Sequence, residues 1–230
     1  MRWWSRWARL RWHGDGYLLS SETLRESFYN RAGALSCRAV AGTSRWAERY
    51  FASSGMGATF VVFASCRGLD ALVASGYSKV DTMKVLVSTT PTEGAGEGTT
   101  TSSPERWTAA YLRAFYGGEE LTRTVKPIVA LLLRDRAATL LEQKVGGEVA
   151  GVLALFRTPG LMGVYCVGTV PEYRKRGVAT SLLAKAGRMA ASERRTLILQ
   201  SLASEGATQL YLDNGFEVMY EKLILEKRLK

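Results

Sequence analysis

The stretch GVYCVGTVPEYRKRGVATSLLAKA, residues Gly163–Ala186, decides the fold. Its apolar run at 164–170 favours a β-strand, and Pro171 ends that strand because proline has no amide hydrogen to give to a sheet. A basic turn ending at Gly177 and an amphipathic run predict a helix next. The unpaired amides and the dipole at the start of such a helix favour phosphate binding. The stretch therefore predicts a strand, a turn and a helix that together bind a diphosphate.

Within it, Arg174, Gly177 and Ala179 form the pattern R-x-x-G-x-A. This pattern resembles the acetyl-CoA pyrophosphate loop of the GNAT N-acetyltransferases, and 169–171 stands where that family has a V-x-P strand end, with Thr in the first place. The resemblance implies acetyl-CoA as co-substrate, with the strand end pairing with its pantetheine arm. The implied binding residues are Val167, Gly168, Thr169, Arg174, Lys175, Arg176, Gly177, Val178, Ala179 and Thr180. The alternative is a basic helix cap in an ordinary α/β protein.

A second segment, ATQLYLDNGF at 207–216, resembles the A-x-x-L-Y-x-x-x-G-F signature of the same family. The resemblance implies that Tyr211 is the general acid that protonates the leaving thiolate, a role that suits a phenol with an ordinary pKa of about 10. The alternative is a core tyrosine with a satisfied hydroxyl. Ser204 stands where many relatives have an asparagine that contacts the CoA arm, and its hydroxyl can still form a hydrogen bond.

The predicted strand lacks the glutamate that serves many relatives as general base, because Tyr165, Cys166 and Thr169 supply no carboxylate. Deprotonation then runs through water and backbone carbonyls, or through a carboxylate outside the strand. Cys166 as a nucleophile would need a nearby base, and the single histidine is His13, so a buried strand cysteine is expected. The resemblance implies direct attack by a primary amine in a ternary complex, without a metal.

Residues 89–104, TTPTEGAGEGTTTSSP, have almost no apolar side chains and are typical of a linker, either a passive tether or a lid. They divide the chain into an N-terminal α/β region at 1–88 and a predicted GNAT N-acetyltransferase domain at 105–230. The element order predicted for the last part matches the GNAT order. The resemblance therefore implies the α/β GNAT (acyl-CoA N-acyltransferase) fold, with a mixed central sheet flanked by helices.

The N-terminal half alternates predicted helices at 22–29, 46–52 and 69–74 with predicted strands at 35–39, 59–64 and 83–87. The segment at 69–77 has a helix followed by glycine and an aromatic residue, as does the segment at 209–218. This faint internal repeat predicts a reduced GNAT-like unit in the N-terminal half. An unrelated α/β extension is the alternative.

Residues 1–12 contain four tryptophans and four arginines. On a helix, Trp3, Trp4, Trp7 and Leu10 would share one face. Such a helix would bind a membrane surface or nucleic acid, or pack its indoles on the protein with arginine stems reaching water. An extended terminus is a third alternative.

The chain of 230 residues carries a formal charge of +10, which favours anionic partners. The phosphates of CoA, nucleic acid and an anionic membrane satisfy that preference equally well, so charge alone does not decide between them. With acetyl-CoA implied by the resemblance, no nucleic acid is expected as a partner, and a homodimer is left open. The sequence has no run of 18 apolar residues, so no transmembrane helix is expected. Three cysteines without C-x-x-C spacing argue against a disulfide framework and favour a cytoplasmic location. One histidine leaves little from which to build a zinc site.

Three functions follow from these patterns, of which the third is a protein that binds nucleic acid or a membrane surface through the terminus at 1–12. The first is an acetyl-CoA-dependent N-acetyltransferase that acts on a primary amine, and the sequence does not identify that amine. The second is a non-catalytic regulatory module that binds CoA or acyl-CoA, an interpretation that the missing acidic base keeps open.

Overall fold

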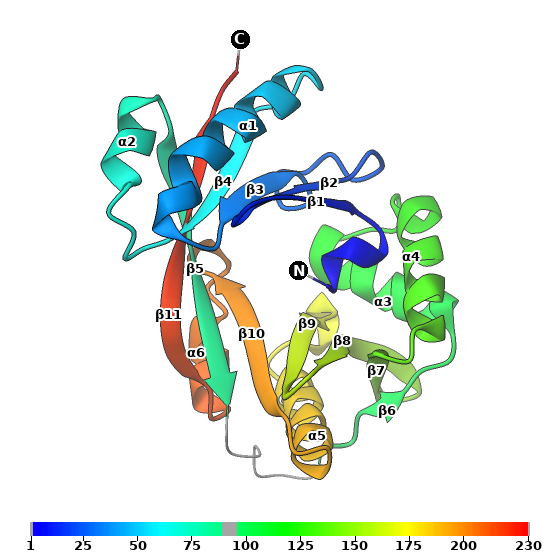
Figure 1. Ribbon diagram of the computed structural model, residues 1–230. Helices are drawn as coiled ribbons and strands as arrows, with labels where there is room; N and C mark the ends of the chain where they lie inside the picture. Colours follow the sequence, from blue (N-terminus) through cyan, green and yellow to red (C-terminus); the bar gives the residue numbers. More distant parts are fainter. Residues whose placement is uncertain (1, 89–95, 230) are drawn as a thin grey trace. The chain divides into compact units, whose positions relative to one another are not determined.

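A computed structural model describes residues 2–88 and 96–229 (Figure 1). The chain forms two compact units that do not follow chain order. The first comprises Met1–Val85, Ser201–Gly206 and Tyr220–Lys230, and the second comprises Leu86–Gln200 and Ala207–Met219. The predicted limits 1–88, 89–104 and 105–230 describe stretches of sequence rather than these units, and they stay a prediction.

The first unit is a sheet with strand order β1-β2-β3-β4-β11-β5. Two helices, α1 and α2, pack on one face, where Leu18, Phe51, Phe60 and Leu72 lie in one apolar core. The elements are η1 (Trp4–Arg6), β1 (Arg9–His13), β2 (Gly16–Ser20), β3 (Arg31–Ala34), η2 (Cys37–Ala39), α1 (Val40–Ala52), β4 (Ala58–Phe63), α2 (Leu69–Ala74), β5 (Ser78–Ser88) and the end of β11 (Glu217–Lys227).

The second unit is a sheet with strand order β10-β9-β8-β7-β6. Helix α5 covers one face and α3 and α4 cover the other (Figure 1), with Leu153, Val164, Leu182 and Leu183 in the core beneath α5. The elements are β6 (Thr99–Thr100), α3 (Pro104–Tyr116), α4 (Thr122–Arg134), β7 (Ala138–Val145), β8 (Glu148–Thr158), β9 (Leu161–Thr169), η3 (Pro171–Tyr173), α5 (Val178–Ser192), most of β10 (Thr196–Leu202) and α6 (Thr208–Asp213). The short turn η4 (Ala203–Glu205), which follows β10, belongs to the first unit.

The internal repeat predicted from the sequence is present in the order of elements. Two antiparallel strand pairs, β1-β2-β3, lead through η2 and α1 to β4, which pairs with β3 in parallel. The second half repeats this with β7-β8-β9, η3, α5 and β10, which pairs with β9 in parallel. A short helix and a final strand follow in both halves.

The ends of the two short helices are built alike. Gly76 has φ +94° and Gly215 has φ +77°, the left-handed conformation that closes a helix. The next amide, of Tyr77 or Phe216, donates to the carbonyl five residues earlier, which belongs to Leu72 in α2 and to Tyr211 in α6. The equivalent of Tyr211 in the first half is therefore a leucine.

Three local predictions for the first half were wrong. Residues 2–12 do not form one helix: η1 is a single short turn, and β1 follows it. Segment 22–29 has bends and turns instead of a helix, and the predicted strand at 35–39 contains η2, while the strand is Arg31–Ala34. Trp3 and Trp4 are buried, and Trp4 packs on Phe28 and Tyr29. These contacts agree with the interpretation in which the terminal indoles pack on the protein.

Part of the predicted linker has a defined place on α5 in the second unit. The Glu97 amide donates to the Ser181 hydroxyl at 2.9 Å, and Arg188 donates to the Gly96 carbonyl at 2.6 Å. Residues 99–100 pair with β7, while 89–95 lie outside the described residues.

The expectation that the cysteines form no disulfide was wrong for one pair, because Cys37 and Cys66 are joined. They tie η2, which precedes α1, to the turn after β4. Their spacing of 29 residues carries no recognisable signal, since only the fold of β3, α1 and β4 brings them together.

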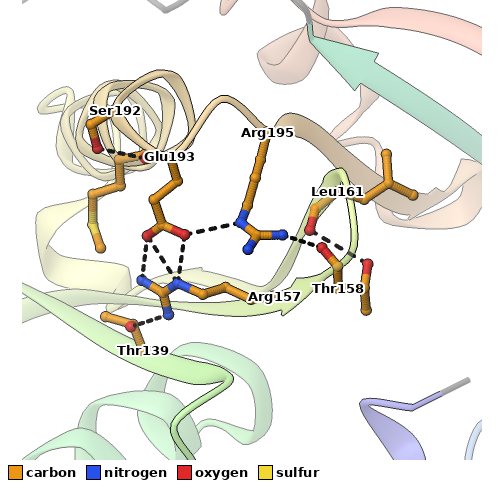
Figure 2. Close-up of polar contacts among 8 residues, drawn as sticks. Thr139, Arg157, Thr158, Leu161, Ser192, Glu193 and Arg195 are labelled. Carbon is orange, nitrogen blue, oxygen red and sulfur yellow. Dashed lines mark hydrogen bonds and ion pairs between the residues drawn. The ribbon is translucent and has the colours of Figure 1, made fainter.

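A network of ion pairs closes the end of the second unit opposite the β9–α5 turn (Figure 2). Arg157 on β8 contacts Glu193 through Nε at 2.8 and 2.9 Å, and Arg195 reaches the same carboxylate at 3.0 Å. Arg157 also donates to the Thr139 hydroxyl at 2.8 Å. The network links the end of α5 to β7, β8 and the start of β10.

Substituting Glu193→Gln should destabilise the protein at neutral pH. The hydrogen bond from Arg157, with further support from Arg195, lowers the pKa of Glu193. A carboxylate with a lower pKa in the folded state stabilises the fold above its ordinary pKa of about 4, and the benefit is lost as pH falls through the folded-state value. We expect a loss of roughly 1–2 kcal/mol at pH 7, shrinking at pH 3, in urea denaturation.

The matched control is Glu148→Gln, because Glu148 is exposed and forms no ion pair among the described residues. Equal losses for the two variants at pH 7 would contradict a stabilising role for the network.

Reduction should destabilise the wild-type protein and leave a Cys37→Ala, Cys66→Ala variant unaffected. Opening a loop of this length is expected to cost about 2–4 kcal/mol. Thermal melting with and without dithiothreitol measures the effect. A wild-type melting temperature that does not respond to the reductant would contradict the disulfide.

Candidate active site

The centre of the candidate site is a bulge in β9. Val152 of β8 pairs with Gly168, but Ala154, two residues further, pairs with Tyr165, so β9 carries one extra residue. Within it Cys166 has φ +53°, a left-handed conformation that a residue with a side chain adopts only at a cost. A bulge of this kind re-aims the backbone of the residues that follow.

Beyond the bulge, β9 loses its neighbour on one side. Within the second unit β10 pairs with β9 only at Leu161–Gly163, whereas β8 accompanies β9 to Thr169. The Val170 amide donates to the Ala150 carbonyl on β8. Because backbone hydrogen-bonding groups alternate in direction along an antiparallel strand, those of Thr169 point away from β8, where its carbonyl accepts from Arg174. Val167 lies in the bulge, where the regular pairing with β8 is interrupted. The strand end therefore offers backbone hydrogen-bonding groups to a ligand.

The turn after β9 ends in a backbone nest. Lys175 has φ +60° and Gly177 has φ +74°, and successive amides in such a turn line an anion-binding concavity. The first bond of helix α5 runs from the Ser181 amide to the Gly177 carbonyl, so the amides of 178–180 precede it. No side chain caps the helix. The space above Gly177 is open. A diphosphate fits these unsatisfied donors.

Two glycines, Gly151 and Gly168, allow β8, β9, the start of α5 and the end of α3 to approach each other closely. A side chain at Gly151 on β8 would collide with Val178 at the start of α5 and with the Gly168 carbonyl. A side chain at Gly168 would collide with the Phe115 ring at the end of α3. The bulged strand, the helix start and the end of α3 are thus in direct contact.

Arg174 contributes mainly to the shape of the loop. Its guanidinium donates to the Thr169 carbonyl at 3.3 Å and to the Ala114 carbonyl at 3.2 Å. Arg176 lies over the Tyr173 ring, 5.6 Å from its centre, and is exposed with Lys175. Two of the three predicted cations therefore face solvent beside the nest, and the third ties the loop to β9 and α3.

Tyr211 lies on α6 in the same core cluster as Val164, Val178 and Leu199, with Val167 packed against it. Its ring contacts that of Phe216, with centres 6.1 Å apart. The residue is buried. The predicted acid and the predicted binding residues on β9 and α5 therefore share one core.

Ser204 is the predicted site residue that belongs to the first unit. Its hydroxyl donates to the Asp81 carboxylate at 2.5 Å, and its amide contacts the same carboxylate at 3.3 Å. Its hydroxyl is thus already engaged, and its contact with CoA stays a prediction.

Cys166 is half-buried rather than fully buried as expected, and desolvation of its thiol raises the pKa to about 12. A neutral thiol is a poor nucleophile, which agrees with the expected structural role of this cysteine.

Among residues 2–88 and 96–229, no group of three or more histidine, cysteine, aspartate or glutamate side chains could hold a metal ion. Within the same residues, no helix is long and apolar enough to cross a membrane.

Sequence reasoning missed the bulge, Gly151 and Phe115. A bulge depends on the register between two strands, which the sequence of one strand does not show. A glycine often marks a left-handed residue, but the left-handed residue of β9 is Cys166. Gly151 follows a β-hairpin turn and reads as part of an ordinary strand. Only the contacts with Val178 and Gly168 give it a role in the site.

Comparisons with known proteins agree with this geometry. Residues 135–218 match the model of the acetyltransferase (GNAT) domain. A comparison with curated protein sequences finds no match.

Several solved structures share the fold over nearly the whole chain. A GCN5-related N-acetyltransferase from Kribbella flavida is 18% identical with a TM-score of 0.72, covering 100% of this chain and 93% of that one. Another from Sphaerobacter thermophilus is 17% identical, TM-score 0.69, with coverage of 97% and 83%. A tandem GNAT protein from the clavulanic acid biosynthesis pathway is 13% identical, TM-score 0.62, with coverage of 96% and 82%.

The match at 135–218, the repeated order of elements and the likeness to a tandem protein lead to one assignment. Residues 135–218 match the acetyltransferase (GNAT) domain, and the chain has the GNAT fold, with a second, GNAT-like order of elements in its N-terminal half.

Proposed function

We propose that this protein is an acetyl-CoA-dependent N-acetyltransferase that moves an acetyl group to a primary amine by direct attack in a ternary complex. The observation that carries the proposal is the bulged strand end of β9 beside the nest at Lys175 and Gly177. Acetyl-CoA needs a binding site for its diphosphate and for its amide-containing arm, and these two elements offer both.

The comparison of the two halves supports a single transfer site. The β2–β3 pair keeps one register from Gly16 to Leu19, without a bulge. Helix α1 is preceded by the disulfide-bonded Cys37 where α5 is preceded by a nest. Leu72 stands at the place of Tyr211. Bulge, nest and tyrosine therefore occur together in the second half.

The chain would divide the chemistry as follows. Amides at Lys175–Thr180, with Arg176, hold the diphosphate. Backbone groups of Val167 and Thr169 orient the arm, and an amide there stabilises the negative charge that develops on the thioester oxygen. Tyr211 holds a proton at Oη for the departing sulfur. The thioester supplies the acetyl group, and the acceptor supplies the amine lone pair.

The proton of the attacking amine needs a route to solvent. Residues 161–169 of β9 contain no carboxylate, so we propose that ordered water, hydrogen-bonded to backbone carbonyls at the strand end, takes the proton and passes it to solvent. This same lack is the observation that favours the second candidate function, a CoA-binding regulatory module without catalysis.

Acetyl-CoA should bind in the micromolar range, and Arg176→Glu should weaken binding at least tenfold by placing a negative charge beside the diphosphate. Isothermal titration calorimetry measures both. Arg136→Glu is the control, since Arg136 is an exposed cation away from the nest in sequence. No binding by the folded wild-type protein would exclude both candidate functions.

Substituting Tyr211→Phe should separate the two candidate functions. As a general acid, Tyr211 should contribute roughly 100-fold to kcat, so the variant should bind acetyl-CoA as the wild type does and release CoA far more slowly in the presence of a panel of primary amines. The free thiol of CoA is measured colorimetrically. A wild-type protein that binds acetyl-CoA and acetylates none of the amines would favour the binding module.

A further inference from the structure

The first unit contains a partly buried lysine on the sheet face opposite α1. Leu223 and Leu225 of β11 pack towards the helices, so the alternation of the strand places Lys222 and Ile224 on the other face. Ile224 packs there with Val61 and Met83. The Lys222 ammonium lies 5.5 Å from the centre of the Phe63 ring and 5.7 Å from that of Tyr220.

A second cation, Arg31, lies on the same face. Ala32 and Ala34 of β3 belong to the helix-side core, which directs Arg31 to the opposite side. Its guanidinium lies 4.6 Å from the Phe28 ring centre and 5.1 Å from that of Trp4, and the residue is almost fully buried. Burial, and in addition the positive charge of Arg31, lower the pKa of Lys222.

Lys227, on the same strand, shows how this chain stabilises a lysine for structural purposes. Its ammonium contacts the Glu48 carboxylate at 2.8 Å and lies 5.7 Å from the centre of the Tyr77 ring. Lys222 has the aromatic contacts alone: among the described residues no carboxylate forms an ion pair with it. A partly desolvated cation that lacks a counter-ion and faces another cation is unfavourable in the ligand-free protein.

We propose that Lys222 binds the carboxylate or phosphate of a small organic anion, whose apolar part lies against Phe63 and Tyr220. Arg31, on β3 beyond the intervening β4, adds a second positive charge to this face. Tyr220 is 37% exposed, and Lys222 and Phe63 are partly exposed, so a ligand can reach the group from solvent. This site belongs to the first unit and does not depend on acetyl transfer in the second.

The first test compares two lysine substitutions in the ligand-free protein. Lys222→Met keeps the apolar stem and removes an uncompensated charge, so the melting temperature should stay equal or rise. Lys227→Met breaks the contact with Glu48, so the melting temperature should fall. A fall of similar size for both variants would mean that Lys222 is structural and would overturn the proposal.

The second test is calorimetric titration at fixed ionic strength with benzoate, phenyl phosphate and inorganic phosphate. At least one of the two organic anions should bind the wild type with a Kd of about 1 mM or below, and Lys222→Met should weaken that binding at least tenfold. The preferred anion identifies the charged group as carboxylate or phosphate. Arg176→Glu should bind the same anion unchanged, which excludes the basic loop of the second unit.

Three results would overturn the proposal. They are no binding of either organic anion, equal binding by Lys222→Met, and inorganic phosphate binding as tightly as the preferred organic anion. The last would remove the role given to Phe63 and Tyr220. None of these measurements uses acetyl-CoA, so they succeed or fail independently of the proposed acetyltransferase activity.

Discussion

One extra residue in β9 is the constraint on which the candidate site depends. The strand must stay paired with β8 up to Thr169 and yet turn its backbone groups outward before it ends. The bulge at Cys166 satisfies both conditions at the cost of a left-handed residue with a side chain. The surrounding contacts hold that conformation: the Val170 amide is bonded to β8, and the Phe115 ring covers Gly168.

The loop and helix that follow are adjusted to this strand end. Gly151 permits Val178 to lie close to β8, and Arg174 bonds the loop to the carbonyls of Thr169 and Ala114. The nest is therefore positioned by contacts on both sides, whereas its own amides at the start of α5 have no cap. Rigid surroundings and unsatisfied donors are what an anion site requires, because the donors then need no rearrangement on binding.

Sequence reasoning predicted the second half well because its signals are local. Hydrophobic periodicity, proline and glycine located the strand, turn and helix of 163–186 and the end of α6. The first half was predicted less well, since Trp4 packs on Phe28 and Tyr29 in an arrangement that only tertiary contacts define. The bulge at Cys166 and the bond between Cys37 and Cys66 depend on residues distant in sequence, which no single-sequence pattern reveals.

The disulfide of the first half lies at the position that corresponds to the β9–α5 turn of the second half. It lies just before α1, at the point of the repeat where the second half presents open amides to solvent. In the first half this position is fixed by a covalent bond between Cys37 and Cys66. In the second half the amides at the start of α5 have no side-chain cap. In the first half, the stability of this position therefore depends on the redox state of the surroundings, whereas in the second half the proposed function assigns the equivalent position to a bound diphosphate.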